Sequence, residues 1–389
     1  MIEATSECTG CRACEQICPT KAIVMRENEE GFSYPIVNIE KCIHCALCDA
    51  HCHLLKPAAA TEEPTAYAAI NQNQHQLALS ASGGIFAGIA SAVLAQGGCV
   101  FGCAYDADMK PHHTMIECSN ELPLLQGSKY VESDLEDCYP RAKQQLLAGR
   151  TVLFCGTGCQ IAGLLAFLGK PCDNLLTISL ICHGVPSRRL FAQHVEAVAR
   201  SHGKRLTDAR FRSKRKPAFD PFCLEHVFDD GSSAFLRASA SAYYQHFLRG
   251  TTYRESCYVC RYASAERICD FTIGDYWGVE RFHPSISASE STSVLLVHTA
   301  KGRKLLNDLR ERLTLIPSQL CWVKAENEQL CHPSKRPEAR SQIYRQIEQL
   351  GYSRWEQQYR HSTLFLKKRL RELIPHSAKA FLKRFLGKR

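Results

Sequence analysis

The sequence predicts a small cysteine-rich α+β module fused to a larger α/β body, followed by a helical basic tail. Three observations support this division. Eight of the 22 cysteines fall between residues 8 and 52 at short, regular spacings. Strand-like and helix-like patterns alternate further along, most clearly over residues 151–181, which is typical of an α/β fold. Residues 361–389 carry nine Lys or Arg and one acid, so most of the net charge of +9 belongs to this tail.

Composition and charge narrow the class of protein. A chain of 389 residues with 45% hydrophobic residues is long enough for two or three globular domains. Its first residues lack the basic and apolar regions of a secretory signal, so we expect reduced cysteines in the cytoplasm. Outside the tail the charge is nearly balanced, and no basic surface with interleaved aromatic residues recurs, so we expect no nucleic-acid partner.

The most apolar segment, residues 83–105, is interrupted by Gln96, Gly97 and Gly98. It fits a helix of about fourteen residues, a glycine turn and a strand better than a membrane span, which needs about 20 apolar residues.

The N-terminal cysteines form a repeat. The first half, "CTGCRACEQICP", has the spacing C-x₂-C-x₂-C-x₃-C-P, and the second half, "CIHCALCDAHC", repeats it without the proline. This is the spacing of bacterial ferredoxins with two 4Fe–4S clusters, in which the fourth cysteine of each half binds the other cluster. The predicted ligands are therefore Cys8, Cys11, Cys14 and Cys52 for one cluster, and Cys42, Cys45, Cys48 and Cys18 for the second.

The alternatives for this repeat are zinc knuckles or small buried thiols, although zinc sites favour paired C-x₂-C motifs. Cys52 is followed by His53 where a ferredoxin has proline. His44, His51 and His53 could tune a cluster through hydrogen bonds, but we expect them to be exposed.

Residues 1–56 are thus predicted to be a two-cluster ferredoxin-type domain, and 57–67, with its prolines and small residues, a linker. The body spans 68–335, and 336–389 is a helical basic extension. Within the body, strands at 151–155 and 175–181 flank a helix at 160–169. A hairpin at 227–236 turns at Asp230–Gly231, and a strand at 293–299 precedes a helix.

Seven motifs appear in order between residues 81 and 280: "ASGGIFAGIA", "VFGCAYDADM", "QGSKYVES", "GTGCQIAGL", "LICHGVPS", "FRSKRK" and "CYVCRYASAERICDFTIGDYWGVE". Together they resemble the coenzyme F-420 hydrogenase/dehydrogenase beta-subunit family, in its bacterial form with an N-terminal ferredoxin domain. The resemblance covers residues 1–335 and implies a flavin-dependent oxidoreductase with FAD beside an additional iron–sulfur cluster. Archaeal members reduce a deazaflavin coenzyme. A flavin also suits a ferredoxin module chemically, because it converts between one-electron and two-electron transfer.

For a third 4Fe–4S cluster, the "CYVC" motif offers Cys257 and Cys260, and Cys159 and Cys182 are the candidates for the other two ligands. Both follow predicted strands of the 151–181 unit, whose ends meet at one sheet edge. The resemblance points to the same cysteines, and Cys155 and Cys269 are reserve candidates. Buried, unliganded thiols are the alternative.

The stretch "LFCGTGCQIAGL" looks like half of a dinucleotide-binding loop, but Ile161 stands where the last glycine is needed. We interpret it as a turn that presents Cys159 to a cluster. The family usually has proline where this chain has Gly158.

Several residues could hold the FAD. Ser82, Gly83 and Gly84 begin a predicted helix, where free N–H groups could bind a phosphate; a simple N-cap with close packing is the alternative. Ser128 and Lys129 could meet the pyrophosphate, and a solvated loop lysine is the alternative. The basic run with Arg212, Lys214, Arg215 and Lys216 could hold the phosphates or an anionic substrate, or form a solvated face. Asp275, Tyr276 and Trp277 lie between two glycines, and an aromatic ring there could stack on the flavin or belong to the core. No catalytic residue is assigned.

We therefore expect an iron–sulfur flavoprotein that exchanges electrons with an external low-potential carrier such as ferredoxin and with a small-molecule substrate. The first alternative is a non-catalytic electron-transfer subunit, and the second is a scaffold with structural clusters. The basic tail predicts peripheral contact with the inner membrane surface, or else a docked helix with an exposed basic face.

Overall fold

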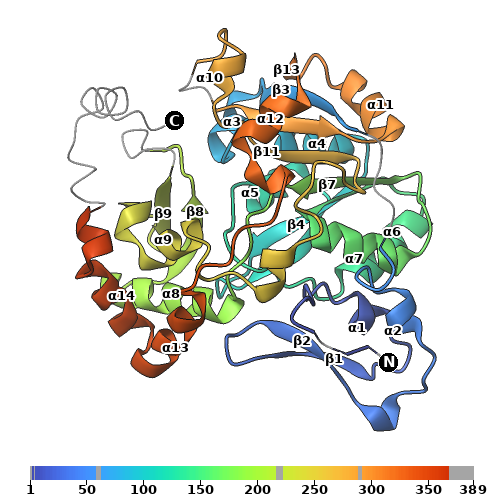
Figure 1. Ribbon diagram of the computed structural model, residues 1–389. Coiled ribbons are helices and arrows are strands. Elements are labelled where there is room, and N and C mark those ends of the chain that lie inside the picture. The colour runs from blue at the N-terminus through green and yellow to red at the C-terminus, as the bar shows by residue number, and fades with distance from the viewer. Residues whose placement is uncertain (1, 4, 58–62, 216–221, 288–290, 368–389) are drawn as a thin grey trace.

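Three sheets organise the chain, each in a different part of it (Figure 1). The computed structural model describes residues 2–3, 5–57, 63–215, 222–287 and 291–367. A two-stranded sheet lies in the N-terminal module, an eight-stranded sheet forms the centre of the body, and a three-stranded sheet lies beside it. This is the predicted division into a small α+β module and a larger α/β body.

The N-terminal module keeps the symmetry of its sequence repeat. Each half contains a short helix, α1 (Ala13–Ile17) and α2 (Leu47–Ala50), and each helix is preceded by a left-handed residue, Arg12 and Ala46. Between them, β1 (Ile23–Glu27) pairs antiparallel with β2 (Ser33–Val37), and a 3₁₀ helix, η1 (Ile39–Lys41), leads into the second half. The two cysteine loops therefore have similar backbone conformations.

The large sheet has the strand order β13–β3–β12–β11–β7–β6–β4–β5. Four neighbouring strands, β4, β6, β7 and β11, run parallel, and the outer strands are antiparallel. The strands are β3 (Thr65–Asn71), β4 (Cys99–Tyr105), β5 (Pro111–Ile116), β6 (Val152–Thr157), β7 (Leu175–Leu180), β11 (Phe271–Asp275), β12 (Ser293–Val297) and β13 (Leu313–Ser318).

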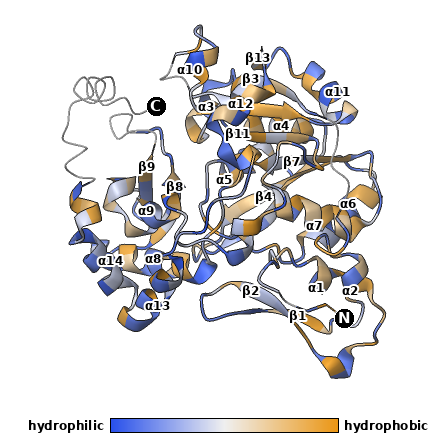
Figure 2. Cartoon of the chain, in the orientation of Figure 1, coloured by the Kyte–Doolittle hydropathy of each residue, from blue (hydrophilic) through white to orange (hydrophobic). Residues whose placement is uncertain are grey.

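Helices cover both faces of this sheet, which is why its central strands are apolar on both sides (Figure 2). Val100 and Leu153 point to the face covered by α4 (Ile85–Ala95) and α11 (Ala300–Asp308). The next residues along each strand, Phe101 and Phe154, pack against α6 (Cys138–Leu147) and α7 (Gly158–Leu168) on the other face. Shorter helices are α3 (Gln74–Leu79), α5 (Leu122–Leu125), α10 (Val279–Phe282) and α12 (Leu320–Glu326), with the 3₁₀ helices η2 (Ser119–Glu121) and η6 (Glu328–Leu330).

The three-stranded sheet is antiparallel, in the order β10–β9–β8, and has its own apolar core. Its strands are β8 (Leu206–Phe211), β9 (Cys223–Phe228) and β10 (Ser233–Arg237). Its helices are α8 (Arg188–His202), α9 (Ala242–Leu248), α13 (Arg340–Leu350) and α14 (Tyr352–Arg360), with the 3₁₀ helices η4 (Ala238–Ala240) and η5 (Glu255–Val259). Because Ile343, Tyr352 and Trp355 belong to this core, the predicted C-terminal extension begins as an integral part of the body.

The predicted unit at 151–181 is confirmed as β6–α7–β7, the hairpin as β9–β10 turning at Gly231, and the strand at 293–299 as β12 followed by α11. The helix, turn and strand within 83–105 are also present, as α4, Gly97 and β4. None of the helices among the described residues has the length and apolar character needed to cross a membrane.

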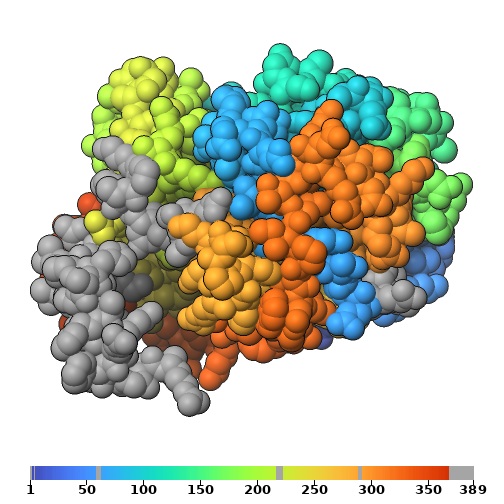
Figure 3. All heavy atoms as spheres, turned by 90° about the horizontal axis from the view of Figure 1, so that it is seen from above, coloured from blue at the N-terminus to red at the C-terminus, as the bar shows by residue number. Residues whose placement is uncertain are grey.

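The predicted linker at 57–67 is too long, because β3 begins at Thr65. This strand lies between β12 and β13, so a segment near the start of the body is enclosed by two of its last strands. On the face seen in Figure 3, blue atoms from the start of the body accordingly lie beside orange atoms from its end. Its buried Ala66, Ala68 and Ala69 are small enough for this crowded position, but alanine carries little strand signal in a sequence.

Candidate metal centres and cofactor cleft

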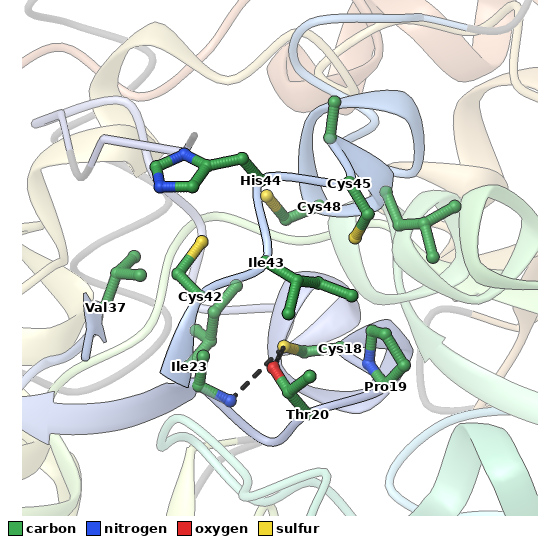
Figure 4. A pocket seen from close by; sticks show the side chains of 13 residues that line it. Cys18, Pro19, Thr20, Ile23, Val37, Cys42, Ile43, His44, Cys45 and Cys48 are labelled. Atoms are coloured by element: carbon green, nitrogen blue, oxygen red, sulfur yellow. Dashed lines mark hydrogen bonds between the residues drawn. The ribbon is translucent and has the colours of Figure 1, made fainter. Parts of the chain in front are cut away.

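The second cysteine set surrounds one cavity. Cys18, Cys42, Cys45 and Cys48 line a space of about 60 Å³ in the N-terminal module, and Figure 4 shows their sulfur atoms around it. Cys18 comes from the first half of the repeat, as the cross-ligation rule predicts. Although burial opposes it, hydrogen bonds from Thr20 and Ala22 lower the pKa of Cys18. These hydrogen bonds therefore reduce the cost of forming a thiolate at the position contributed by the other half.

The first set gathers on the side of the module that faces the body. Burial, together with the neighbouring thiols of Cys8 and Cys52, raises the pKa of Cys11 to about 12. The thiols of Cys11, Cys8 and Cys52 likewise add to the burial that raises the pKa of Cys14. Cys52 of the second half thus lies among the cysteines of the first half, as predicted. Bound iron would reverse these shifts, because a coordinating thiol is deprotonated.

The third set, Cys159, Cys182, Cys257 and Cys260, also comes together. Cys159 lies in the first turn of α7, Cys182 follows β7, and the last two lie in and just after η5. Burial, followed by the nearby thiols of Cys182, Cys159 and Cys260, raises the pKa of Cys257. Burial and Cys260 likewise raise the pKa of Cys182 to about 11.

The reserve candidates lie elsewhere. Burial raises the pKa of Cys155 to about 12, and its thiol neighbour is Cys103. Cys269 lies 3.4 Å from the hydroxyl of Thr272. Neither belongs to the third set. Within the part of the chain that the structure describes, no three His, Cys, Asp or Glu side chains are spaced for a single metal ion. A 4Fe–4S cube binds one thiolate at each of its four irons, so a cluster site does not need three ligands around a single metal ion.

Buried arginines hold the module against the body, and sequence reasoning missed them. Arg254, three residues before Cys257, is 1% exposed. It donates to the carbonyl oxygens of Cys8 (2.8 Å) and Ser33 (2.7 Å) and to the carboxylate of Glu132 (2.7 Å). The only feature of the sequence that could have pointed to Arg254 is its position close to the "CYVC" motif. Arg340 of α13 similarly pairs with Glu30 at the turn between β1 and β2.

The residues proposed for FAD binding lie in one region of the body. Arg212 forms an ion pair with Asp275, and its guanidinium lies 4.8 Å from the ring centroid of Trp277. Lys214, two residues on, donates to the carbonyl oxygens of Leu77 (2.9 Å) and Ser82 (2.6 Å). The residue before Arg212, Phe211, forms a bridge with Ser128, which brings the "QGSKYVES" segment alongside.

Ser82 and Gly83 are occupied by contacts within the protein. The Ser82 hydroxyl donates to the Thr292 carbonyl (3.0 Å), and the Gly83 N–H donates to the Ser293 hydroxyl (2.9 Å). A Cβ on Gly83 would lie 2.4 Å from the carbonyl oxygen of Ala69. Ser82 and Gly83 therefore fit the close-packing alternative better than they fit a phosphate site. Gly84 is the N-cap of α4 and has a left-handed conformation (φ 75°).

Some basic side chains of this region lack an anionic partner among the described residues or have a nitrogen atom without a hydrogen bond. Among the described residues, Lys129 and Lys214 bond only to backbone carbonyl oxygens. Burial lowers the pKa of Lys214 to about 8 and also lowers that of Lys129. The buried Nε of Arg212 has no partner in the described part of the chain. Arg215, by contrast, pairs with the buried Glu225 (2.9 Å), and Lys216 lies outside the described residues.

An open cleft of about 440 Å³ lies at Trp277. His183, directly after Cys182, lines it together with Tyr253 and Trp277, and charged Arg249 and Glu328 also face it. Tyr276 is buried and bonded to Ser318 (2.6 Å), so Trp277 is the aromatic residue of this segment that reaches the cleft.

Two family models match the chain. Residues 149–319 match the C terminus of the coenzyme F420 hydrogenase/dehydrogenase beta subunit, and residues 7–54 match the 4Fe-4S dicluster domain. The resemblance inferred from the seven motifs is confirmed, and the chain is an iron–sulfur electron-transfer protein of an oxidoreductase family.

One solved structure that the chain resembles is a chain of the F420-reducing [NiFe] hydrogenase complex from Methanosarcina barkeri, in a xenon derivative. The two are 14% identical with a TM-score of 0.46, and the match covers 75% of this chain and 94% of that one. No curated protein sequence matches the chain.

Proposed function

We propose that the protein is an iron–sulfur flavoprotein oxidoreductase that connects an external one-electron carrier to a small-molecule substrate through three 4Fe–4S clusters and FAD. The arrangement of the three cysteine sets supports this most directly. The second set includes the exposed Cys45, the first set faces the body, and Cys182 of the third set directly precedes His183, which lines the cleft. Clusters in these sites would transfer single electrons, which is the chemistry of the 4Fe–4S group.

The basic residues around Arg212 fit an anionic cofactor. Two half-buried ammonium groups with only carbonyl partners, and a guanidinium nitrogen without one, would gain from a pyrophosphate. Lys129, Lys214 and Arg212 would hold the phosphates, with Ser128 alongside, and Trp277, which stacks on Phe222, connects this group of residues to the cleft. When bound, FAD would exchange electrons singly with a cluster and in pairs with a substrate.

The exposed surface of the module supports a protein partner as the electron carrier. Half of the large exposed apolar side chains described in the structure lie in its few residues: Val24, Ile36, Ile39, Ile43, Leu47 and Leu55. Ile43 and Leu47 also line the cavity of the second set. Small apolar surfaces of this kind suit the transient contacts of redox proteins. Membrane contact through the tail stays a prediction, because residues 368–389 lie outside the described residues.

Anaerobic purification followed by iron, sulfide and flavin analysis tests this function. We expect about twelve irons and one FAD per chain, since each cube contains four irons. About eight irons without flavin would contradict the proposal and support the non-catalytic electron-transfer subunit.

A further inference from the structure

Two side chains connect the first cysteine set to the third. His53 directly follows Cys52, and Tyr262 lies two residues after Cys260. The Nδ1 atom of His53 lies 2.5 Å from the hydroxyl oxygen of Tyr262, and the ring centroids are 5.5 Å apart. The other ring nitrogen lies 3.1 Å from the hydroxyl of Thr9, in the loop of the first set. One hydrogen-bonded chain therefore runs from this loop to the third set.

His53 is 3% exposed, so the expectation that it faces solvent is wrong. His51 is half-buried, with Nδ1 2.5 Å from the Ala166 carbonyl, and of the three histidines only His44 is exposed. Sequence could not show this, because one of the two residues that bond to the ring, Tyr262, is 209 positions away.

The backbone of the body comes very close at the same place. A Cβ on Gly163 of α7 would lie 2.9 Å from the Cβ of Cys11 and 3.0 Å from its sulfur. The helix that presents Cys159 in its first turn therefore rests directly against a cysteine of the first set. Only a residue without a side chain permits this separation.

Tyr262 lies between the two sets. After burial, the nearby thiols of Cys159, Cys11 and Cys260 raise the pKa of its phenol. Cys11 belongs to the first set and the other two belong to the third. The phenol thus faces both.

Gly158 provides the space for this tyrosine. A Cβ on Gly158 would lie 2.6 Å from the Cβ of Tyr262, so a larger residue there would displace the ring. Gly158 makes room for Tyr262, and His53 bonds to it.

We propose that the His53–Tyr262 hydrogen bond is a positioning contact that fixes the first and third clusters relative to each other, and thereby sets the rate of electron transfer between them. This inference rests on the proposed function, because it requires both clusters. In each event the first cluster is oxidised by one electron and the third is reduced by one, with no other reactant. A buried hydrogen bond of this kind is stronger and better defined than one in water.

The experiment uses the full-length, iron-loaded protein mixed with a reduced 2Fe–2S ferredoxin and frozen at successive times for EPR. The third cluster is identified as the signal that a Cys257→Ser variant lacks. Tyr262→Phe and His53→Leu should slow its appearance several-fold, with the first two clusters reduced at the wild-type rate. His53→Gln, which can still bond to the hydroxyl, should transfer like wild type. The double variant should be no slower than either single one, because both lose the same contact.

Tyr344→Phe is the matched control. It also removes a buried hydroxyl, which donates to the Thr252 carbonyl (2.8 Å) and makes no bond between the first and third sets, and it should leave the rate unchanged. Fully iron-loaded Tyr262→Phe with wild-type transfer would overturn the inference and leave the proposed function standing. A wild-type protein without a third cluster would overturn the proposed function itself. If Tyr262→Phe loses iron, the His53→Leu variant provides the test instead. An unchanged rate of electron transfer in His53→Leu would then refute the proposed role of the contact.

Discussion

At the residue scale, the surroundings of each sulfur separate the twelve candidate ligands from the other cysteines. Members of the three sets have cysteines of their own set as neighbours, whereas the thiol neighbour of Cys155 is Cys103, outside the sets. Cys138 donates to the His113 carbonyl (3.2 Å) within the core, and Cys118, Cys321 and Cys331 are exposed. Spacing alone predicts the first two sets, whereas support for the third comes from the fold, which brings distant cysteines together.

Replacing Cys182 or Cys257 by serine should remove the third cluster, because a cube that loses one of four thiolates is poorly held. We expect iron to fall from about twelve to about eight per chain. Cys155→Ser and Cys269→Ser are the controls and should retain all the iron. Equal iron loss in the reserve positions would show that the third set is assigned wrongly.

Lys214 gives the cofactor region a pH dependence. Burial, and then the nearby Arg212, lower the pKa of Lys214 to about 8, so it loses its charge as the pH rises through 8. The protonated form attracts an anion, and FAD affinity should therefore fall between pH 7 and pH 9. Titration of the flavin-free protein with FAD, followed by fluorescence, measures this.

Lys214→Gln should weaken FAD binding at pH 7 by about 1.5 kcal/mol, about tenfold, and flatten the pH profile. Lys204→Gln, in a surface pair with Asp230, should change neither. A steep profile that persists in Lys214→Gln would assign the pH dependence to another group.

At the scale of elements, the sequence predicted units built from neighbouring residues and missed those built from distant ones. The alternation of apolar and helical periods predicted β6, α7 and β7, since each depends on its own residues. The position of β3 depends on Leu295 and Leu315, more than 200 residues later, and no local pattern encodes that pairing. The same holds for the site: cysteine spacing predicted the ligands of the module, but the carbonyl partners of Lys214 and the burial of His53 are long-range contacts.

The contact between α13 and the β1–β2 turn should contribute measurably to stability. Arg340 is 1% exposed, pairs with Glu30 and donates to the Tyr253 carbonyl (3.0 Å). Arg340→Met leaves the carboxylate without its partner and should lower the free energy of unfolding by about 3 kcal/mol. Urea titration measures this loss.

The control is Arg281→Met, which breaks the exposed pair with Glu326 and should cost less than about 1 kcal/mol. Similar losses in both variants would mean that the Arg340 contact adds nothing beyond a surface ion pair.

At the scale of the whole molecule, several buried histidines make the fold sensitive to acid. Burial lowers the pKa of His113, His246 and His298 to about 4 and that of His194 to about 3. Unfolded histidines have a pKa near 6.5, so between these values the unfolded state binds more protons than the folded state. Their contribution to stability is complete above pH 6.5 and is lost as the pH falls toward 4.

We therefore expect the free energy of unfolding to fall from pH 7 to pH 5 by on the order of 1 kcal/mol per buried histidine. Urea titrations at the two pH values, with iron measured on the same samples, test this. Replacing His298 by Gln should reduce the pH dependence. A stability that is independent of pH over this range would show that these histidines titrate normally in the folded protein.

The place of β3 in the large sheet has a consequence for how the protein is made. During synthesis the N-terminal module can be complete once residue 56 has left the ribosome, because its strands pair only with each other. The body cannot close its sheet until β13 at residues 313–318 has been translated, since β3 must wait for both of its neighbours. The eight cysteines of the module can therefore bind iron while the central sheet of the body is still incomplete. The site of the third cluster, which belongs to the body, forms after the sites in the module.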